Sequence, residues 1–189
     1  MKIGVLALQG NYDMHATVLK SIGTKPKYIR YPEELDDVKG LVIPGGESTT
    51  MSKLMARIGM FEKIHDFARN YPVLGTCAGL IMMSKDVDGN LPTLGLLEIK
   101  TVRNGYGRQI NSGTVQVDFK LKNTDHSIPA SFIRAPMIKD YSNNVEVIAE
   151  YDKVPVIVKE GKHVAISFHP ELDNVSVLHE YVFLGNDNS

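Results

Sequence analysis

The chain has 189 residues, enough for one substantial hydrophobic core, and we expect a single domain over residues 1–189. Its formal net charge is −1, 43% of its residues are hydrophobic, and no run of Lys or Arg predicts a nucleic-acid or membrane partner. One cysteine excludes an internal disulfide. The apolar stretch at the N-terminus is too short for a membrane span and lacks a signal-peptide cleavage pattern, so we expect a cytoplasmic protein.

The first half of the chain alternates apolar runs with segments of helical periodicity. Nearly continuous apolar runs predict buried strands at residues 2–8, 40–43 and from 72, and residues 27–31 form a further short strand candidate. Apolar residues at helical spacing predict helices over residues 14–22, 54–58 and 61–67, a helical turn from 32, and an apolar helix after 77. This alternation is typical of an α/β fold in which helices flank a mainly parallel central sheet.

The second half of the chain has a different pattern. Short alternating segments are separated by Gly, Asn, Asp and Pro, which predicts smaller, partly antiparallel strands beside the parallel core. These segments cover residues 96–102, 113–121, 131–133, 145–151, 154–158 and 163–168. A last helix is predicted over residues 177–182.

The only cysteine lies in GTCAG at residues 75–79, between a buried strand and an apolar helix. The Gly-x-Cys-x-Gly pattern has the form of a nucleophile elbow, in which small neighbours let the strand and the helix approach closely. A thiol at the start of a helix also favours the reactive thiolate. The motif therefore indicates that Cys77 is a nucleophile, although a buried cysteine in a strand-to-helix connection fits the same pattern.

A candidate base follows an apolar strand in SFHPE at residues 167–171. Side chains two residues apart on an extended strand face the same way, and Pro170 keeps the preceding residue extended. His169 and Glu171 should therefore lie together, and a carboxylate beside an imidazole can fix its tautomer. A solvent-facing His-Pro-Glu turn fits equally well. For the other histidines we expect surface roles: His15, His65, His126, His163 and His179.

Two glycines follow another buried strand in PGGES at residues 44–48. Their backbone N–H groups can turn toward a ligand at the carboxyl edge of the sheet. With the N–H of Ala78, the Gly46 N–H would then form an oxyanion hole. A simple glycine turn, with Ser48 capping the next helix, is the alternative. No set of His, Cys, Asp and Glu has the spacing of metal ligands, so we expect neither a metal nor a cofactor.

Together, GTCAGL at residues 75–80 and FHPE at 168–171 resemble the triad-type, class I glutamine amidotransferases. Within that family the chain is similar to the glutaminase subunits of pyridoxal 5'-phosphate synthase. This similarity is carried by LQG at 8–10, PGGESTT at 44–50, RN at 103–104 with GRQ at 107–109, and FIRAP at 132–136. The chain departs from the family pattern at residues 11–13. It also departs at position 106, where it has Tyr106 and phenylalanine is common in the family.

The resemblance implies hydrolysis of L-glutamine to L-glutamate and ammonia through a thioester. The ammonia would pass to a separate synthase subunit that makes pyridoxal 5'-phosphate (vitamin B6), and the isolated chain would have low activity. Cys77 would be the nucleophile, His169 the base and Glu171 its orienter. The positions that match the family's glutamine-binding residues are Gly46, Glu47, Ser48, Arg103, Ile133 and Arg134.

Two other kinds of function remain open at this point. The chain could be a related elbow hydrolase, such as a cysteine peptidase or an amidotransferase whose ammonia goes elsewhere. It could also be a catalytically silent subunit that keeps the fold for binding, although all three triad residues are retained.

Overall fold

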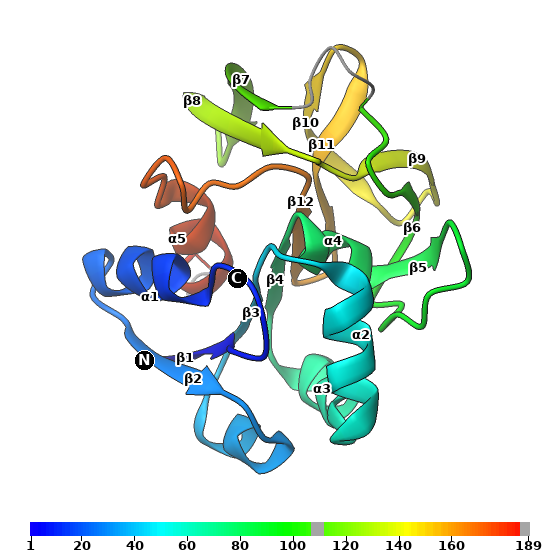
Figure 1. Cartoon of the computed structure of the whole chain (residues 1–189). Coiled ribbons are helices and arrows are strands. Elements are labelled where there is room, and N and C mark those ends of the chain that lie inside the picture. The colour runs from blue at the N-terminus through cyan, green and yellow to red at the C-terminus, as the bar shows by residue number, and fades with distance from the viewer. Residues whose placement is uncertain (107–111, 186–189) are drawn as a thin grey trace.

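A seven-stranded sheet forms the centre of the molecule (Figure 1). The computed structural model describes residues 1–106 and 112–185, so the GRQ motif at residues 107–109 lies outside the described part. The strands, in their order across the sheet, are β10 (Glu146–Tyr151), β11 (Val154–Glu160), β12 (His163–Ile166), β4 (Val73–Thr76), β3 (Leu41–Ile43), β1 (Lys2–Leu6) and β2 (Lys25–Ile29). The strands from β12 to β2 are parallel, and β11 and β10 continue the sheet in antiparallel pairing.

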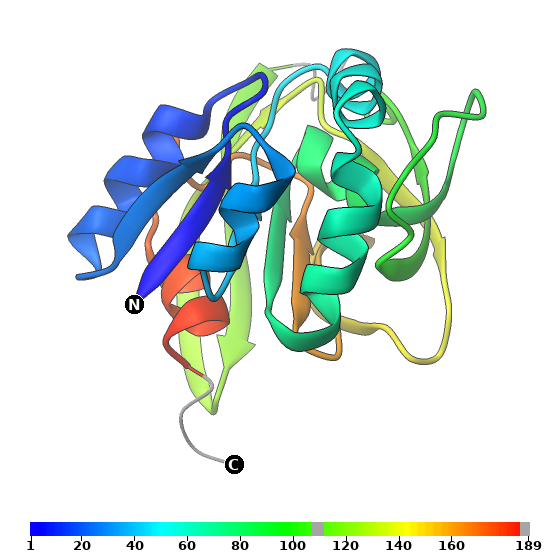
Figure 2. The same cartoon turned by 90° about the horizontal axis from the view of Figure 1, so that it is seen from below.

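Helices cover both faces of this sheet (Figure 2). On one face, α1 (Tyr12–Ser21) and α5 (Val177–Phe183) contribute to one apolar cluster. On the other, a 3-10 helix η1 (Pro32–Asp37), α2 (Ser48–Arg57), α3 (Met60–Asn70) and α4 (Ala78–Met83) contribute to a second cluster. Within the described ranges, no helix has both the length and the apolar composition needed to cross a membrane.

The central strands alternate their side chains between the two clusters. Val42 of β3 packs in the cluster with α1 and α5, whereas Leu41 and Ile43 on either side of it pack in the cluster with α2 and α3. All three side chains are fully buried. A strand buried on both faces must be apolar along its whole length, which is why these strands appear in the sequence as continuous apolar runs.

Two smaller strand groups lie beside the central sheet. One is a three-stranded sheet of β5 (Ser84–Val87), β6 (Leu97–Val102) and β9 (Met137–Tyr141). The other is an antiparallel hairpin of β7 (Ser112–Leu121) and β8 (Thr124–Ile133). Its two-residue loop, Lys122-Asn123, has positive φ at both positions, as in the tight turns that match the twist of a hairpin.

The predicted α/β class with a mainly parallel central sheet is confirmed, and most predicted elements lie where expected. The break between two helices falls at Gly59, whose φ is 70°. The later strands differ from the prediction, because β10, β11 and β12 extend the central sheet itself. The segment predicted at 131–133 is the end of a ten-residue strand. β5 and β9 were not predicted, because they are short and half polar.

Candidate active site

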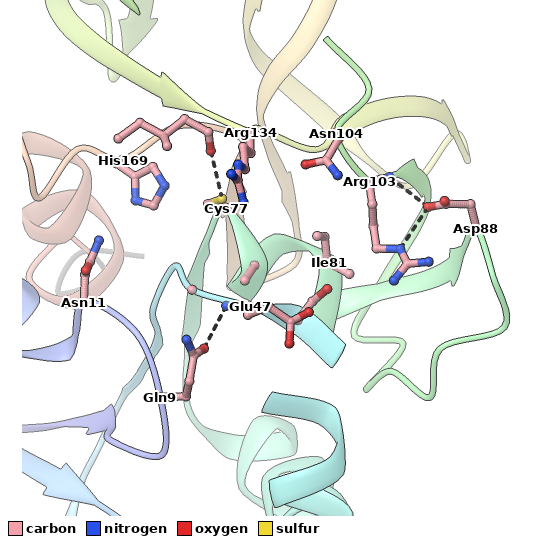
Figure 3. A pocket seen from close by; sticks show the side chains of 14 residues that line it. Gln9, Asn11, Glu47, Cys77, Ile81, Asp88, Arg103, Asn104, Arg134 and His169 are labelled. Carbon is pink, nitrogen blue, oxygen red and sulfur yellow. Dashed lines mark hydrogen bonds and ion pairs between the residues drawn. The ribbon is translucent and has the colours of Figure 1, made fainter. Parts of the chain in front are cut away.

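Loops that follow β1, β3, β4 and β12 meet at the carboxyl edge of the central sheet, where open α/β sheets bind ligands. A cavity of about 690 Å³ opens at this edge, large enough for a small molecule (Figure 3). Its lining residues are Gln9, Asn11, Gly46, Glu47, Ser48, Cys77, Ala78, Ile81, Asp88, Arg103, Asn104, Ile133, Arg134 and His169. Every residue predicted for the site lines this cavity except Glu171, which contacts His169 from behind.

Cys77 occupies the turn between β4 and α4, as a nucleophile elbow requires. Its backbone has φ 50° and ψ −105°, a conformation that residues with a side chain rarely adopt. The Cys77 N–H donates to the Ile166 carbonyl at 2.8 Å, which ties the turn to the neighbouring strand β12. The thiol lies 3.9 Å from the Ile133 carbonyl oxygen at the end of β8. The strained turn therefore presents the sulfur to the cavity.

His169 lies beside Cys77 (Figure 3), and Glu171 orients its ring. The His169 Nδ1–H donates to Oε1 of Glu171 at 2.7 Å, which leaves Nε2 for the sulfur. Burial by itself lowers the pKa of His169, but hydrogen bonds to Cys77 and Glu171 and their negative charges raise it to about 10. The imidazole is therefore protonated at neutral pH, the state that pairs with a thiolate.

The glycine turn after β3 lies directly against the catalytic pair. A Cβ added to Gly45 would lie 2.8 Å from Nδ1 of His169 and 3.4 Å from Cβ of Cys77, so only glycine fits. The loop after β1 holds this turn, because Asn11 N–H donates to the Gly45 carbonyl at 3.1 Å and Glu47 N–H donates to Oε1 of Gln9 at 2.8 Å.

The residues after this turn start α2 in a way that differs from the prediction. Glu47, not Ser48, caps the helix, because its carboxylate accepts from the backbone N–H groups of Thr49 at 3.0 Å and Thr50 at 2.7 Å. The hydroxyl of Thr50 also donates to it. These hydrogen bonds, that of the Thr50 side chain foremost, lower the pKa of Glu47. Ser48 is the first helical residue and is buried.

Two arginines line the cavity on the side of the smaller strand groups (Figure 3). Arg103 follows β6, and its Nη1 donates to Oγ1 of Thr49 at 3.3 Å. Its backbone N–H donates to Oδ1 of Asp88 at 2.8 Å, and its Nε lies 3.5 Å from the same oxygen. Arg134 follows β8 in a turn with φ 47°. Asp88 was missed from the sequence, where it is one polar residue in a loop.

The end of the hairpin is fastened to the segment after β12 that carries His169. The backbone N–H of His169 donates to the Ser131 carbonyl at 3.0 Å. Ser131 in turn donates to both carboxylate oxygens of Asp173, through its backbone N–H and its hydroxyl, each at 3.0 Å. These hydrogen bonds fix the end of β8, so Ile133, two residues further on, lines the cavity with its carbonyl oxygen beside the Cys77 thiol.

The surface role expected for five histidines is wrong for two of them, and a third, His163, is half-buried and accepts from the backbone N–H of Val73 at 3.2 Å. His15 and His179 are fully buried behind the site. A signal was present in the sequence, because His15 precedes Val18 and Leu19 by three and four residues and so lies on the apolar stripe of its helix. His179 stands in the same relation to Val182.

Comparisons with known proteins agree with this geometry. A family model, described as the SNO glutamine amidotransferase family, matches residues 5–186. The chain belongs to the SNO glutamine amidotransferase family. Its α/β fold is shared with a structure titled "Crystal structure of glutamine amidotransferase", with a TM-score of 0.91 and 38% identity over 96% of this chain and 97% of that one.

Two curated members of this glutamine amidotransferase family carry the same name, pyridoxal 5'-phosphate synthase subunit PdxT. The protein from Thermosipho africanus is 46% identical over 184 residues, which cover 96% of each chain. The protein from Francisella philomiragia is 40% identical over 181 residues, which cover 96% of this chain and 97% of the relative. The similarity therefore spans nearly the whole chain, not the motifs alone.

Proposed function

We propose that this protein is the glutaminase subunit of a pyridoxal 5'-phosphate synthase, which hydrolyses L-glutamine to L-glutamate and supplies the ammonia to a synthase subunit. The observation that carries this proposal is the meeting of Cys77 and His169 at one cavity, with Glu171 behind the imidazole. The family and the similarity to PdxT subunits support glutamine as the substrate and a synthase as the partner.

The first half of the reaction is an acyl transfer to sulfur. The Cys77 thiolate attacks the side-chain amide carbon of glutamine, and the backbone N–H groups of Gly46 and Ala78 hold the developing oxyanion. The imidazolium of His169 then gives its Nε2 proton to the leaving nitrogen. The carbon–nitrogen bond breaks, ammonia leaves, and a γ-glutamyl thioester remains on Cys77.

The second half returns the enzyme to its starting state. His169, now neutral, takes a proton from a water molecule while the water oxygen attacks the thioester carbon. The carbon–sulfur bond then breaks, which releases glutamate and restores the thiolate beside an imidazolium. Glu171 stays ionised throughout and stabilises the imidazolium through its hydrogen bond with Nδ1.

The remaining cavity residues would bind the amino-acid end of the substrate. Arg103 and Arg134 are suited to the α-carboxylate, because a guanidinium forms paired hydrogen bonds with a carboxylate. Gly46, Glu47, Ser48 and Ile133 complete the glutamine site, as in the family pattern.

Ammonia release from glutamine by the chain, with and without the synthase subunit, tests the proposal. We expect little hydrolysis by the isolated chain and a marked rise with the synthase. The orientation of the Gly45–Gly46 peptide sets the oxyanion hole, and contacts from Gln9 and Asn11 hold that peptide. Equal rates of glutamine hydrolysis with and without the synthase subunit would refute activation of this chain by its partner.

Substitution of the nucleophile separates the glutaminase from the other functions. Cys77→Ala and Cys77→Ser should abolish ammonia release and labelling by a glutamine-like electrophile, while the fold is kept. Hydrolysis of peptides in preference to glutamine would favour a peptidase. Unlabelled, inactive wild-type chain in the full complex would favour a silent subunit.

We further propose that residues 1–189 act as one domain and that the protein works in the cytoplasm.

A further inference from the structure

A second group of buried polar side chains lies behind the catalytic pair. His15 of α1 and His179 of α5 are both 0% exposed, and Nδ1 of His15 lies 2.9 Å from Nε2 of His179. The other ring nitrogen of His15, Nε2, lies 3.0 Å from Oγ1 of Thr76 and 3.4 Å from Oε2 of Glu171. A continuous path of polar contacts therefore runs from His179 through His15 to the carboxylate that orients His169.

The charges of these groups limit the protons that each ring carries. Burial lowers the pKa of His15 and lowers that of His179 to about 3, so both rings are neutral and carry one N–H each. Burial would raise the pKa of Glu171, but the imidazoles of His15 and His169 lower it, so the side chain is a carboxylate. A carboxylate only accepts hydrogen bonds, so the His15 tautomer with its proton on Nε2 is the one that can donate to Glu171. In that tautomer Nδ1 of His15 accepts from Nε2–H of His179.

The carboxylate of Glu171 has one oxygen well satisfied and one not. Oε1 accepts from His169 at 2.7 Å, whereas Oε2 is buried and has no hydrogen bond of ordinary geometry within the described residues. A buried, charged oxygen without a donor is costly. The His15 Nε2–H at 3.4 Å is placed to supply that donor after a small rotation of the carboxylate.

We propose that His15 is a positioning residue of the triad, which donates from Nε2 to Oε2 of Glu171 and is held in the required tautomer by His179. This inference rests on the proposed function. With a donor on each oxygen, the carboxylate cannot rotate, and the plane of the His169 ring is fixed toward Cys77. The same His15 nitrogen contacts Thr76, the residue before the nucleophile. The His15 side chain therefore contacts a neighbour of Cys77 and the carboxylate that orients His169.

Packing alone does not account for these two histidines. The other buried side chains of their helices, among them Leu19 and Val182, belong to the apolar cluster on that face of the sheet. Replacing buried polar groups in such a place with apolar ones of similar volume is often neutral or stabilising. Neither histidine lines the cavity, so each can act on the reaction only through Glu171 or Thr76.

Two substitutions of His15 test the proposal in the complete complex with the synthase. In His15→Gln the amide nitrogen can take the place of Nε2, whereas the shorter amide of His15→Asn reaches only the place of Nδ1 and leaves Oε2 of Glu171 without a donor. We expect His15→Gln to keep kcat within about threefold of wild type. His15→Asn should lower kcat about 10- to 100-fold with little change in KM, because a hydrogen bond to a charged group is lost.

Controls separate positioning from packing. The same Gln and Asn pair at the exposed His65 of α3 should leave kcat unchanged. If His15→Asn does not fold, the pair His179→Gln and His179→Asn makes the same comparison one contact further away, with the same order of activity. Proton NMR gives a readout besides activity, since the His169 Nδ1–H resonance should persist in His15→Gln and be lost or shifted in His15→Asn.

The failures of the two proposals are distinguishable. Equal kcat in His15→Gln and His15→Asn, or a loss confined to KM, in a complex whose wild type is active would refute the role of His15 alone. A wild-type complex that releases no ammonia from glutamine would refute the proposed function, and the catalytic purpose of His15 with it.

Discussion

Gly45→Ala is a small change whose effect can be worked from the structure. Its methyl group would overlap Cε1 of His169, the nearest atom, and would lie 2.8 Å from Nδ1, where ordinary van der Waals contact begins at about 3.4 Å, so the ring must retreat by more than about 0.6 Å. The turn itself cannot yield easily, because the Gly45 carbonyl accepts from Asn11 and packs against Gly10. The imidazole is therefore the group that moves, and it also loses its 2.7 Å hydrogen bond with Glu171.

A displacement of this size at a reacting group is costly for catalysis. Misplacement by about 1 Å can reduce the rate about 100-fold, so we expect Gly45→Ala to lower kcat about 30- to 100-fold. The assay is ammonia release from glutamine by the complex with the synthase. Gly113→Ala is the matched control, because this exposed strand glycine has nothing within 4 Å of an added Cβ. A folded Gly45→Ala variant with kcat within threefold of wild type would refute the reasoning.

Three further predictions concern charged or titrating groups. Glu171→Gln should lower kcat about 10²- to 10⁴-fold in the ammonia assay, because a neutral amide can hold His169 in the wrong tautomer; unchanged kcat would contradict this. Burial lowers the pKa of His163 to about 4 from an unfolded value near 6.5. The unfolded state therefore takes up a proton first, and the free energy of unfolding should decrease as the pH falls from 6.5 toward 4. His163→Asn should flatten that slope in denaturant titrations, and a parallel slope would count against it. Asp88→Asn should raise KM for glutamine about two- to fivefold by weakening the hold on Arg103, and a change in kcat alone would argue for another role.

Much of the architecture could be predicted because the relevant signals are local. Strands buried on both faces must be apolar throughout, so β1, β3 and β4 are visible as runs in the sequence. The elbow at Cys77 and the spacing of His169 and Glu171 are also local, since each depends on two to five adjacent residues. The structure brings Cys77 and His169 to one cavity, as the order of parallel strands requires, with Glu171 behind the imidazole.

The features that were missed depend on contacts distant in the sequence. Asp88 contributes only because β5 pairs with β6, which brings it beside Arg103. His15 and His179 meet across 164 residues, so the apolar stripe of each helix could indicate that the histidine is buried but not which partner it contacts. Glu47, and not Ser48, is the N-cap residue of α2, because its carboxylate accepts hydrogen bonds from two backbone N–H groups of the first turn.

The two ends of the β7–β8 hairpin have unequal importance. At the end near the cavity, Ser131 and Asp173 fasten it to the segment after β12 that carries His169, whereas at the far end the two-residue loop Lys122-Asn123 turns it back. Lengthening that distant loop leaves the anchored pairing in place, so peptide tags or reporter labels inserted there should be tolerated. A single-residue deletion within β8, by contrast, would turn Ile133 to the opposite side and dismantle one wall of the cavity.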